Sequence, residues 1–321
     1  MKPPSKPQPI ATRRSPLALV QARLVQSLLA GACGLDAKDA EAAFPILGLV
    51  STGDRIQDRT LLEAGGKGLF TKEIDEAQLS GEAAFAVHSM KDVPTELPDG
   101  LILGAILERE DPRDMLLARG GETRLADLPE GAVIGTASLR RQAQLLYARP
   151  DLKVIPLRGN VDTRLGKLRD GEVHATFLAR AGLNRLGRSE ADGTPLDIAE
   201  MLPAVAQGAI GVAVRDGDTE AQALARRLNH EATEFAITAE RAFLRALDGS
   251  CRTPIAAHLH NESMELTGEV LTPDGRIRWR EHMHIDTSTA TLDDARRAGQ
   301  ALGEAVRTLA GPQLNEVLGT A

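Results

Sequence analysis

The chain has 321 residues, of which 42% are hydrophobic and 26% are charged, and its formal net charge is −7. This composition is typical of a folded globular protein with several domains and excludes fibrous and strongly disordered classes. The acidic balance argues against non-specific nucleic-acid binding, because that binding needs a basic face to neutralise phosphates. We therefore expect no nucleic-acid partner.

The sequence contains no apolar run that approaches the roughly 18 residues needed to span a bilayer. Its first nine residues hold four prolines, where a signal peptide would need an apolar segment. We therefore expect a cytoplasmic protein without a membrane partner, in which Cys33 and Cys251 both remain reduced thiols.

Strands and helices alternate along the first two thirds of the chain. A short strand at 10–11 leads to Ser15 and Pro16, which predict the N-cap and the first residue of a helix that runs to Gly31. A later strand that leads to Ser138 and a second helix repeats this arrangement. The alternation predicts parallel sheets with helices on both faces and ligand sites at the C-terminal ends of the strands. The further predicted elements are strands at 46–51, 83–87, 101–107, 133–135, 153–157 and 173–178, and helices at 71–80, from 139 onward and around Leu165 and Leu168.

The last third of the chain has a different pattern. Two helices, at 218–228 and 231–247, precede three consecutive strands and a closing helix. This order predicts a small α+β domain. The predicted strands lie at 255–260, 264–271 and 276–285, with a turn at 273–275, and the closing helix lies at 291–310.

Basic and hydroxyl side chains recur directly after predicted strands and at helix starts. A helix N-terminus presents unpaired N–H groups and a partial positive charge, so an added arginine favours a carboxylate or phosphate site there. The alternative, N-capping with solvated arginines, remains open for each site taken alone. The residues are Arg13, Ser15, Ser138, Arg140, Arg141, Arg158, Asn160 and Arg164.

Two single residues suggest chemistry. Asp92 follows a strand of small residues, in a loop where its carboxylate can stabilise a developing cation or move a proton; an ordinary turn aspartate is the alternative. Cys251 follows a long helix and precedes Arg252, whose charge favours a thiolate that acts as a nucleophile or an attachment point, although a lone cysteine is usually inert. His88 and Cys33 are interpreted as packed residues.

Two other patterns do not predict sites. Alternating histidines, His258 and His260 with His282 and His284, would lie on one face of adjacent strands, but no carboxylate or cysteine spacing completes a metal site. The GGKGLF stretch at 65–70 lacks the Ser or Thr and the glycine spacing of a phosphate loop, so we predict no nucleotide site.

Ten segments together resemble the porphobilinogen deaminase, or hydroxymethylbilane synthase, family, and they follow the family order across nearly the whole chain. The resemblance implies a transferase that condenses four porphobilinogen molecules head to tail, releases ammonia and frees linear hydroxymethylbilane by hydrolysis, in tetrapyrrole and heme biosynthesis. The segments are ATRRSPLAL (11–19), STGD (51–54), GGKGLFTKE (65–73), HSMKDVP (88–94), EREDPRD (108–114), GTASLRRQ (135–142), LRGNVDTRL (157–165), AGLNRLG (181–187), LPAVAQGAIG (202–211) and GSCRTPI (249–255).

The resemblance also implies a monomer with two periplasmic-binding-protein-like α/β domains and a small C-terminal α+β domain. Domain 1 would comprise 1–107 and 209–226 and hold the catalytic cleft. Domain 2, over 108–208, would form the carboxylate-binding side of that cleft, and domain 3, over 227–321, would carry the cysteine loop.

A dipyrromethane cofactor attached through the sulfur of Cys251 is implied as well, with Asp92 as the catalytic group that contacts pyrrole nitrogens. Each pyrrole carries an acetate and a propionate, so a growing chain needs cationic partners. The implied cofactor-binding residues are Cys251, Ser89, Lys91, Ser138, Arg140, Arg141 and Arg164. The implied substrate-binding residues are Arg13, Ser15, Lys67, Arg158 and Arg185.

The chain departs from the family pattern at two positions. Glu63 stands where many relatives have a lysine, and Ser250 stands where a glycine commonly precedes the cysteine; we interpret both as tuning, because neither removes a catalytic group. Two other functions remain open. One is a two-lobed module that binds an anionic small molecule without chemistry, and the other is a thiol hydrolase using Cys251, for which no paired base is evident.

Overall fold

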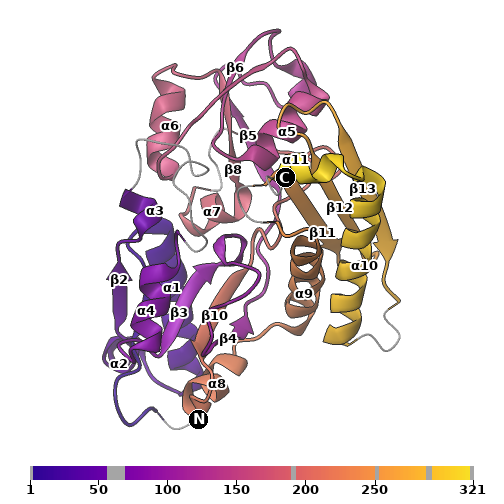
Figure 1. The fold of residues 1–321 in the computed structure, drawn as a ribbon. Coiled ribbons are helices and arrows are strands. Elements are labelled where there is room, and N and C mark those ends of the chain that lie inside the picture. The colour runs from indigo at the N-terminus through magenta and orange to yellow at the C-terminus, as the bar shows by residue number, and fades with distance from the viewer. Residues whose placement is uncertain (1–2, 56–68, 189–192, 250–252, 287–290, 319–321) are drawn as a thin grey trace. The chain divides into compact units, whose positions relative to one another are not determined.

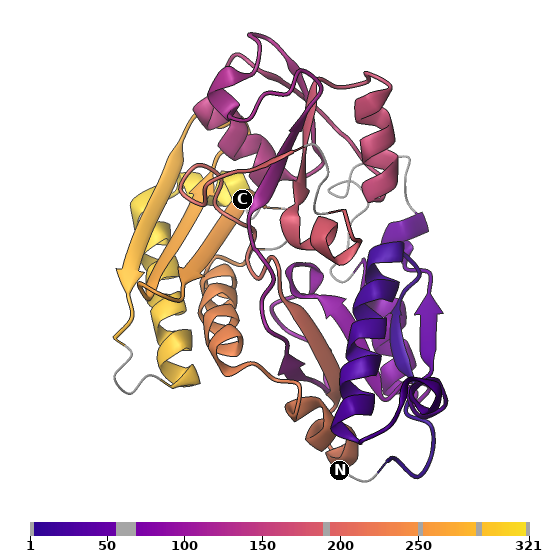
Figure 2. The ribbon, with the colours of Figure 1, turned by 180° about the vertical axis from the view of Figure 1, so that it is seen from behind.

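The computed structural model of the chain is drawn in Figures 1 and 2. The described chain forms two compact units, each with its own five-stranded sheet. The divisions between the units fall at 110/111, 208/209 and 234/235. The residues that the structure describes are 3–55, 69–188, 193–249, 253–286 and 291–318.

The sheet of the first unit has the strand order β2-β1-β3-β10-β4. β1 pairs in parallel with β2 and β3, whereas β10 pairs antiparallel with β3 and β4. The prediction of parallel sheets holds for β1, β2 and β3 but not for β10, a strand from a distant part of the chain that enters the sheet in the opposite direction. The strands are β1 (Ile10–Arg13), β2 (Ile46–Leu49), β3 (Phe85–Ser89), β4 (Leu101–Ile106) and β10 (Ile210–Arg215).

Helices cover both faces of this sheet. The predicted start of α1 is confirmed, since the Ser15 hydroxyl accepts a hydrogen bond from the Ala18 N–H at 3.3 Å and Pro16 is the first helical residue. Seen from behind in Figure 2, α1 lies across one face. The helical elements are α1 (Pro16–Ala32), α2 (Ala37–Ala43), α3 (Thr52–Arg55), α4 (Lys72–Leu79), η1 (Met90–Asp92) and α8 (Thr219–Arg226).

The core of the first unit follows the two-residue period of its strands. Phe85 and Val87 of β3 belong to the apolar cluster that includes residues of α1 and α8. Ala86, between them, packs in the cluster that includes Ile74 of α4. Successive side chains of a strand point to opposite faces, so both faces of the sheet are buried by packing. Only the ends of the strands remain available for binding a ligand.

The second unit repeats this construction with the order β7-β6-β8-β5-β9. β6 pairs in parallel with β7 and β8, and β5 pairs antiparallel with β8 and β9. The strands are β5 (Asp114–Ala118), β6 (Val133–Gly135), β7 (Lys153–Ile155), β8 (Ala175–Ala179) and β9 (Thr194–Pro195), and the helical elements are η2 (Leu125–Asp127), α5 (Leu139–Ala148), α6 (Val161–Arg169) and α7 (Arg180–Arg185).

The C-terminal part contains the predicted three-stranded antiparallel sheet, β11-β12-β13. From Phe235 onward this part clusters with the second unit; the three-domain boundaries stay a prediction. The α/β fold class with an added small α+β part is confirmed. The elements are α9 (Glu231–Ala246), β11 (Ile255–His260), β12 (Glu265–Leu271), β13 (Arg278–His284), α10 (Leu292–Ala310) and α11 (Gln313–Leu318).

The two histidine pairs are not on adjacent strands, because β12 lies between β11 and β13. Over the described ranges, no group of three or more His, Cys, Asp or Glu side chains is arranged to hold a metal ion. Within the same ranges, no single helix has the length and apolarity to cross a membrane, and the one helix pair that passes this test together, α1 with α2, is bent by 104°.

Close packing of α10 against α9 depends on glycine. A Cβ atom at Gly299 would overlap the carbonyl of Ala239 and lie 2.8 Å from the Cβ of Ala242. We expect Gly299→Ala to lower the free energy of unfolding by about 1–3 kcal/mol, since the helices must move apart. The matched control is Gly166→Ala in α6, where no described atom other than those of the adjacent residues and the helix's own backbone lies within 4 Å of the added carbon; there we expect a gain of about 0.5–1 kcal/mol. Urea denaturation of both variants measures the difference, and equal stabilities would contradict the packing argument.

Candidate functional site

A pocket in the first unit lies where the parallel strands β1 and β3 end. Arg13 and Ser15 reach it from the end of β1, and Ser89, Lys91 and Asp92 reach it from the end of β3 and from η1. Carboxyl ends of neighbouring parallel strands are a common place for ligand sites. The structure thus brings together five residues that the sequence analysis selected.

The pocket holds two cationic side chains beside one carboxylate. Arg13, Lys91 and Asp92 are all half-buried, so their charges are partly shielded from water. The guanidinium of Arg13 lies over the ring of Phe70, 4.4 Å from the ring centroid, which is a cation–π contact. This charge pattern suits a ligand that carries carboxylates and a group on which positive charge develops.

The hydroxyl of Ser89 is held from α1. The side-chain amide of Gln21 is buried, and its Nε2 and Oε1 atoms lie 2.9 Å and 3.1 Å from the Ser89 Oγ. Because Gln21 contacts the hydroxyl through both amide atoms, it fixes the direction in which Ser89 can bind anything else in the pocket.

His88 lines the same pocket but is a neutral, packed residue. Its burial and the positive charge of Arg13 lower the pKa of its imidazole to about 4. The ring therefore carries no charge near neutral pH, which agrees with its interpretation as a packed histidine.

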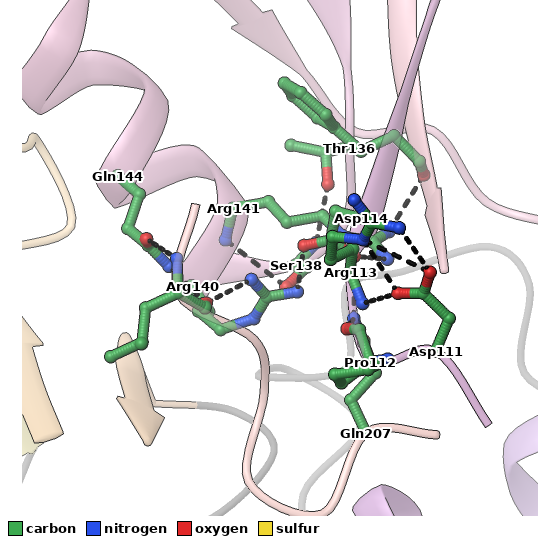
Figure 3. Close-up of polar contacts among 12 residues, drawn as sticks. Asp111, Pro112, Arg113, Asp114, Thr136, Ser138, Arg140, Arg141, Gln144 and Gln207 are labelled. Carbon is green, nitrogen blue, oxygen red and sulfur yellow. Dashed lines mark hydrogen bonds and ion pairs between the residues drawn. The ribbon is translucent and has the colours of Figure 1, made fainter. Parts of the chain in front are cut away.

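A second polar cluster lies in the second unit, at the start of α5 (Figure 3). Asp114, the first residue of β5, is fully buried between two guanidinium groups. Its Oδ2 atom lies 2.7 Å from Nη2 of Arg140, and its Oδ1 atom lies 2.8 Å from Nη2 of Arg141. The amide of Gln207 donates a further hydrogen bond to Oδ1 at 2.9 Å.

The two arginines of this cluster are themselves buried, with 4% and 5% of their surface exposed. Arg140 donates to the Leu202 carbonyl and Arg141 to the Phe177 carbonyl, each at 2.8 Å. Within the described part of the chain, neither Nε–H has a partner. The alternative of solvated arginines is therefore excluded for this pair, although Ser138 does cap α5 by accepting from the Arg141 N–H.

The pKa values of the charged groups reflect the charge balance of this cluster. Burial acts to raise the pKa of Asp114, but the two guanidinium groups outweigh it and hold that pKa well below its usual range. Burial lowers the pKa of Arg140, and Asp114 opposes that effect. One carboxylate against two guanidinium groups leaves a net positive charge, which makes this region suitable for an anion.

The remaining selected residues that the structure describes lie in and around α6 and α7 of the second unit. Arg164 in α6 donates from Nε to the Gly159 carbonyl at 2.9 Å, and Asn160 caps that helix. Arg158 is half-buried in the loop before it. Arg185, at the end of α7, donates to the Gly208 carbonyl at 2.6 Å. Lys67 and Cys251, together with the departures at 63 and 250, lie outside the described residues.

Sequence reasoning missed four residues that organise these sites. They hold the selected residues in place rather than follow a strand or start a helix, and no local pattern distinguishes them. Three of them did lie within segments that carried the family resemblance, at 65–73, 108–114 and 202–211. The residues are Gln21, Phe70, Asp114 and Gln207.

Comparison with known proteins gives matches along most of the chain. The family model for "Porphobilinogen deaminase, dipyromethane cofactor binding domain" matches residues 9–223, and that for "Porphobilinogen deaminase, C-terminal domain" matches residues 234–308. Proteins named porphobilinogen deaminase are similar over nearly full length. One from Phenylobacterium zucineum is 50% identical, covering 94% of this chain and 96% of the relative, and one from Caulobacter sp. strain K31 is 49% identical, covering 96% and 98%.

Solved structures show weaker likeness. The periplasmic aliphatic sulphonate binding protein SsuA from Escherichia coli has a TM-score of 0.41 and 14% identity, covering 76% of this chain and 71% of that one. A YaeC-family lipoprotein from Enterococcus faecalis has a TM-score of 0.41 and 13% identity, covering 72% and 94%. The fold class rests on the sheets described above and not on these matches.

The lowered pKa of His88 predicts an acid-dependent loss of stability. In the unfolded chain this histidine takes a proton below its usual pKa of about 6.5, whereas the folded protein excludes the proton until about pH 4. Unfolding is therefore favoured as the pH falls through this window. We expect wild type to lose about 2 kcal/mol relative to His88→Gln between pH 7.5 and pH 5, measured by denaturant unfolding at each pH. A difference independent of pH would show that His88 is not held neutral.

Proposed function

Because the chain belongs to the porphobilinogen deaminase family, we propose that it condenses four porphobilinogen molecules head to tail and frees hydroxymethylbilane by hydrolysis. The activity is that of a transferase in tetrapyrrole and heme biosynthesis. The family domain that matches residues 9–223 binds a dipyrromethane cofactor.

The described residues fit that cofactor. Its pyrroles carry carboxylates, and the buried pair Arg140 and Arg141 has a net positive charge with two Nε–H groups that lack a partner in the described part of the chain. Arginine binds carboxylates through paired N–H groups. When bound, the cofactor supplies the pyrrole carbon that is extended. The proposed binding residues are Ser89, Lys91, Ser138, Arg140, Arg141 and Arg164, with covalent attachment at Cys251.

The pocket around Asp92 supports the proposed chemistry most directly. Each condensation breaks the aminomethyl C–N bond of porphobilinogen, releases ammonia and forms one C–C bond, so positive charge develops near the pyrrole N–H. Asp92 is proposed as the catalytic group because its carboxylate lies in the pocket and can stabilise that charge without moving.

Carboxylate recognition is proposed for the cations around this group. Arg13 and Lys91 line the pocket with Asp92, and guanidinium and ammonium groups bind acetate and propionate by charge-assisted hydrogen bonds. The proposed substrate-binding residues are Arg13, Ser15, Lys67, Arg158 and Arg185. We propose a cytoplasmic monomer that acts on porphobilinogen and has no nucleic-acid or membrane partner.

Attachment at Cys251 predicts a change in mass. Protein expressed with substrate available should carry a mass excess equal to two linked pyrrole units, because the sulfur holds the cofactor covalently. Cys251→Ala should lose this excess, whereas Cys33→Ala should keep it, since Cys33 is a buried thiol of the first unit's core. Intact-mass spectrometry decides the outcome. An unmodified wild-type protein that binds porphobilinogen tightly but releases no ammonia would favour a binding module instead.

Removal of the Asp92 charge should stop turnover without unfolding the protein. We expect Asp92→Asn to lower kcat for ammonia release from porphobilinogen by at least ~100-fold, because the developing positive charge loses its stabilising carboxylate. The control is Asp99→Asn, at an exposed position between η1 and β4, which should keep wild-type kcat. Ammonia release is measured at saturating porphobilinogen, and near-normal turnover by Asp92→Asn would rule out the assigned role.

A further inference from the structure

Two neighbouring residues of α5 direct their side chains at the same carboxylate. Successive residues of an α-helix point about 100° apart, and the guanidinium groups of Arg140 and Arg141 repel each other. Both nevertheless reach Asp114, one at each carboxylate oxygen, as Figure 3 shows. The buried anion between them is what permits this convergence.

The orientation of each guanidinium is fixed at two points. Nη2 of each arginine binds Asp114, and Nη1 binds a backbone carbonyl, that of Leu202 for Arg140 and that of Phe177 for Arg141. A rotation of either side chain would break both bonds. The carbonyls alone leave each group free to pivot, so Asp114 supplies the second constraint.

Asp114 is in turn held by Gln207. The Gln207 amide donates to Asp114 Oδ1 at 2.9 Å and to the Pro112 carbonyl at 2.7 Å. It therefore joins the chain just before β5 to the segment that follows Leu202. Because the Gln207 amide is neutral, its removal changes how Asp114 is held without changing the charge of the cluster. The effect of position can therefore be measured apart from the effect of the Asp114 charge.

We propose that Asp114 is a positioning residue, which holds Arg140 and Arg141 in the orientation that binds carboxylates of the pyrrole chain, and that Gln207 keeps Asp114 in place. The inference rests on the proposed function. It assigns no contact with the reacting atoms to Asp114, whose carboxylate is fully buried.

A double-mutant cycle tests this role. The measured quantity is the ratio of cofactor-loaded to unloaded protein among folded molecules, read from intact mass after purification. We expect Asp114→Asn and Arg141→Gln each to lower the ratio about tenfold. The double variant should fall by clearly less than the product of the two single losses, about a hundredfold, because part of the effect of Asp114 passes through Arg141 and the rest through Arg140. A purely structural role would lower the unfolding midpoint but would leave the ratio unchanged.

The control variant removes a different Asp–Arg pair of the same unit. Asp151 accepts from Arg149 Nε at 2.7 Å at the exposed end of α5, so Asp151→Asn should load as wild type does. If Asp114→Asn does not fold, Gln207→Leu replaces it, and a two- to threefold lower ratio is expected because the carboxylate loses one of its holders.

Three outcomes would overturn the inference. The first is wild-type cofactor loading in Asp114→Asn, and the second is wild-type loading in Gln207→Leu where that variant is used. The third is a loaded-to-unloaded ratio that falls about a hundredfold in the double variant, the product of the two single losses. An unloaded wild-type protein has a different meaning, since it would refute the proposed function itself.

Discussion

Charge compensation at Asp114 is the interaction on which the second unit depends. Burial of a guanidinium costs several kcal/mol unless an anion and hydrogen bonds accompany it, and removal of the only anion from such a group costs about 3–5 kcal/mol. Here one carboxylate serves two arginines. The start of β5, the start of α5 and the segment after Leu202 are held together by these few bonds.

A second carboxylate extends this balance into the C-terminal part. Glu269 on β12 is fully buried and lies 2.8 Å from Arg280 Nε. Burial raises the pKa of Glu269 and Arg280 opposes the rise, while the charge of Glu269 also acts favourably on Arg140. The antiparallel sheet thus interacts electrostatically with Arg140, in agreement with its grouping in the same compact unit.

The sequence predicts the features that local chemistry determines. Ser15 and Ser138 both cap the helices expected after them, because a hydroxyl that accepts from an unpaired N–H group stabilises the first turn of a helix. The strands β5 and β10 were not predicted from the alternation of strands and helices, since each pairs antiparallel with a partner distant in the chain. Asp114 escaped for the same reason: its meaning depends on Arg140, Arg141 and Gln207, and no spacing along the chain reveals that they meet.

The two units use one construction for opposite electrostatic purposes. In each, a strand leads to a serine-capped helix with arginines nearby. In the second unit the carboxylate of Asp114 is paired with arginines, whereas in the first unit the carboxylate of Asp92 lines a pocket. A carboxylate that must stabilise a transient cation is weakened by every permanent cation close to it. His88 lines that pocket and stays neutral because it is buried beside Arg13, and the charge of Arg13 is directed over Phe70. The absence of a third positive charge there favours the role that we propose for Asp92, which is to stabilise positive charge that develops during the reaction.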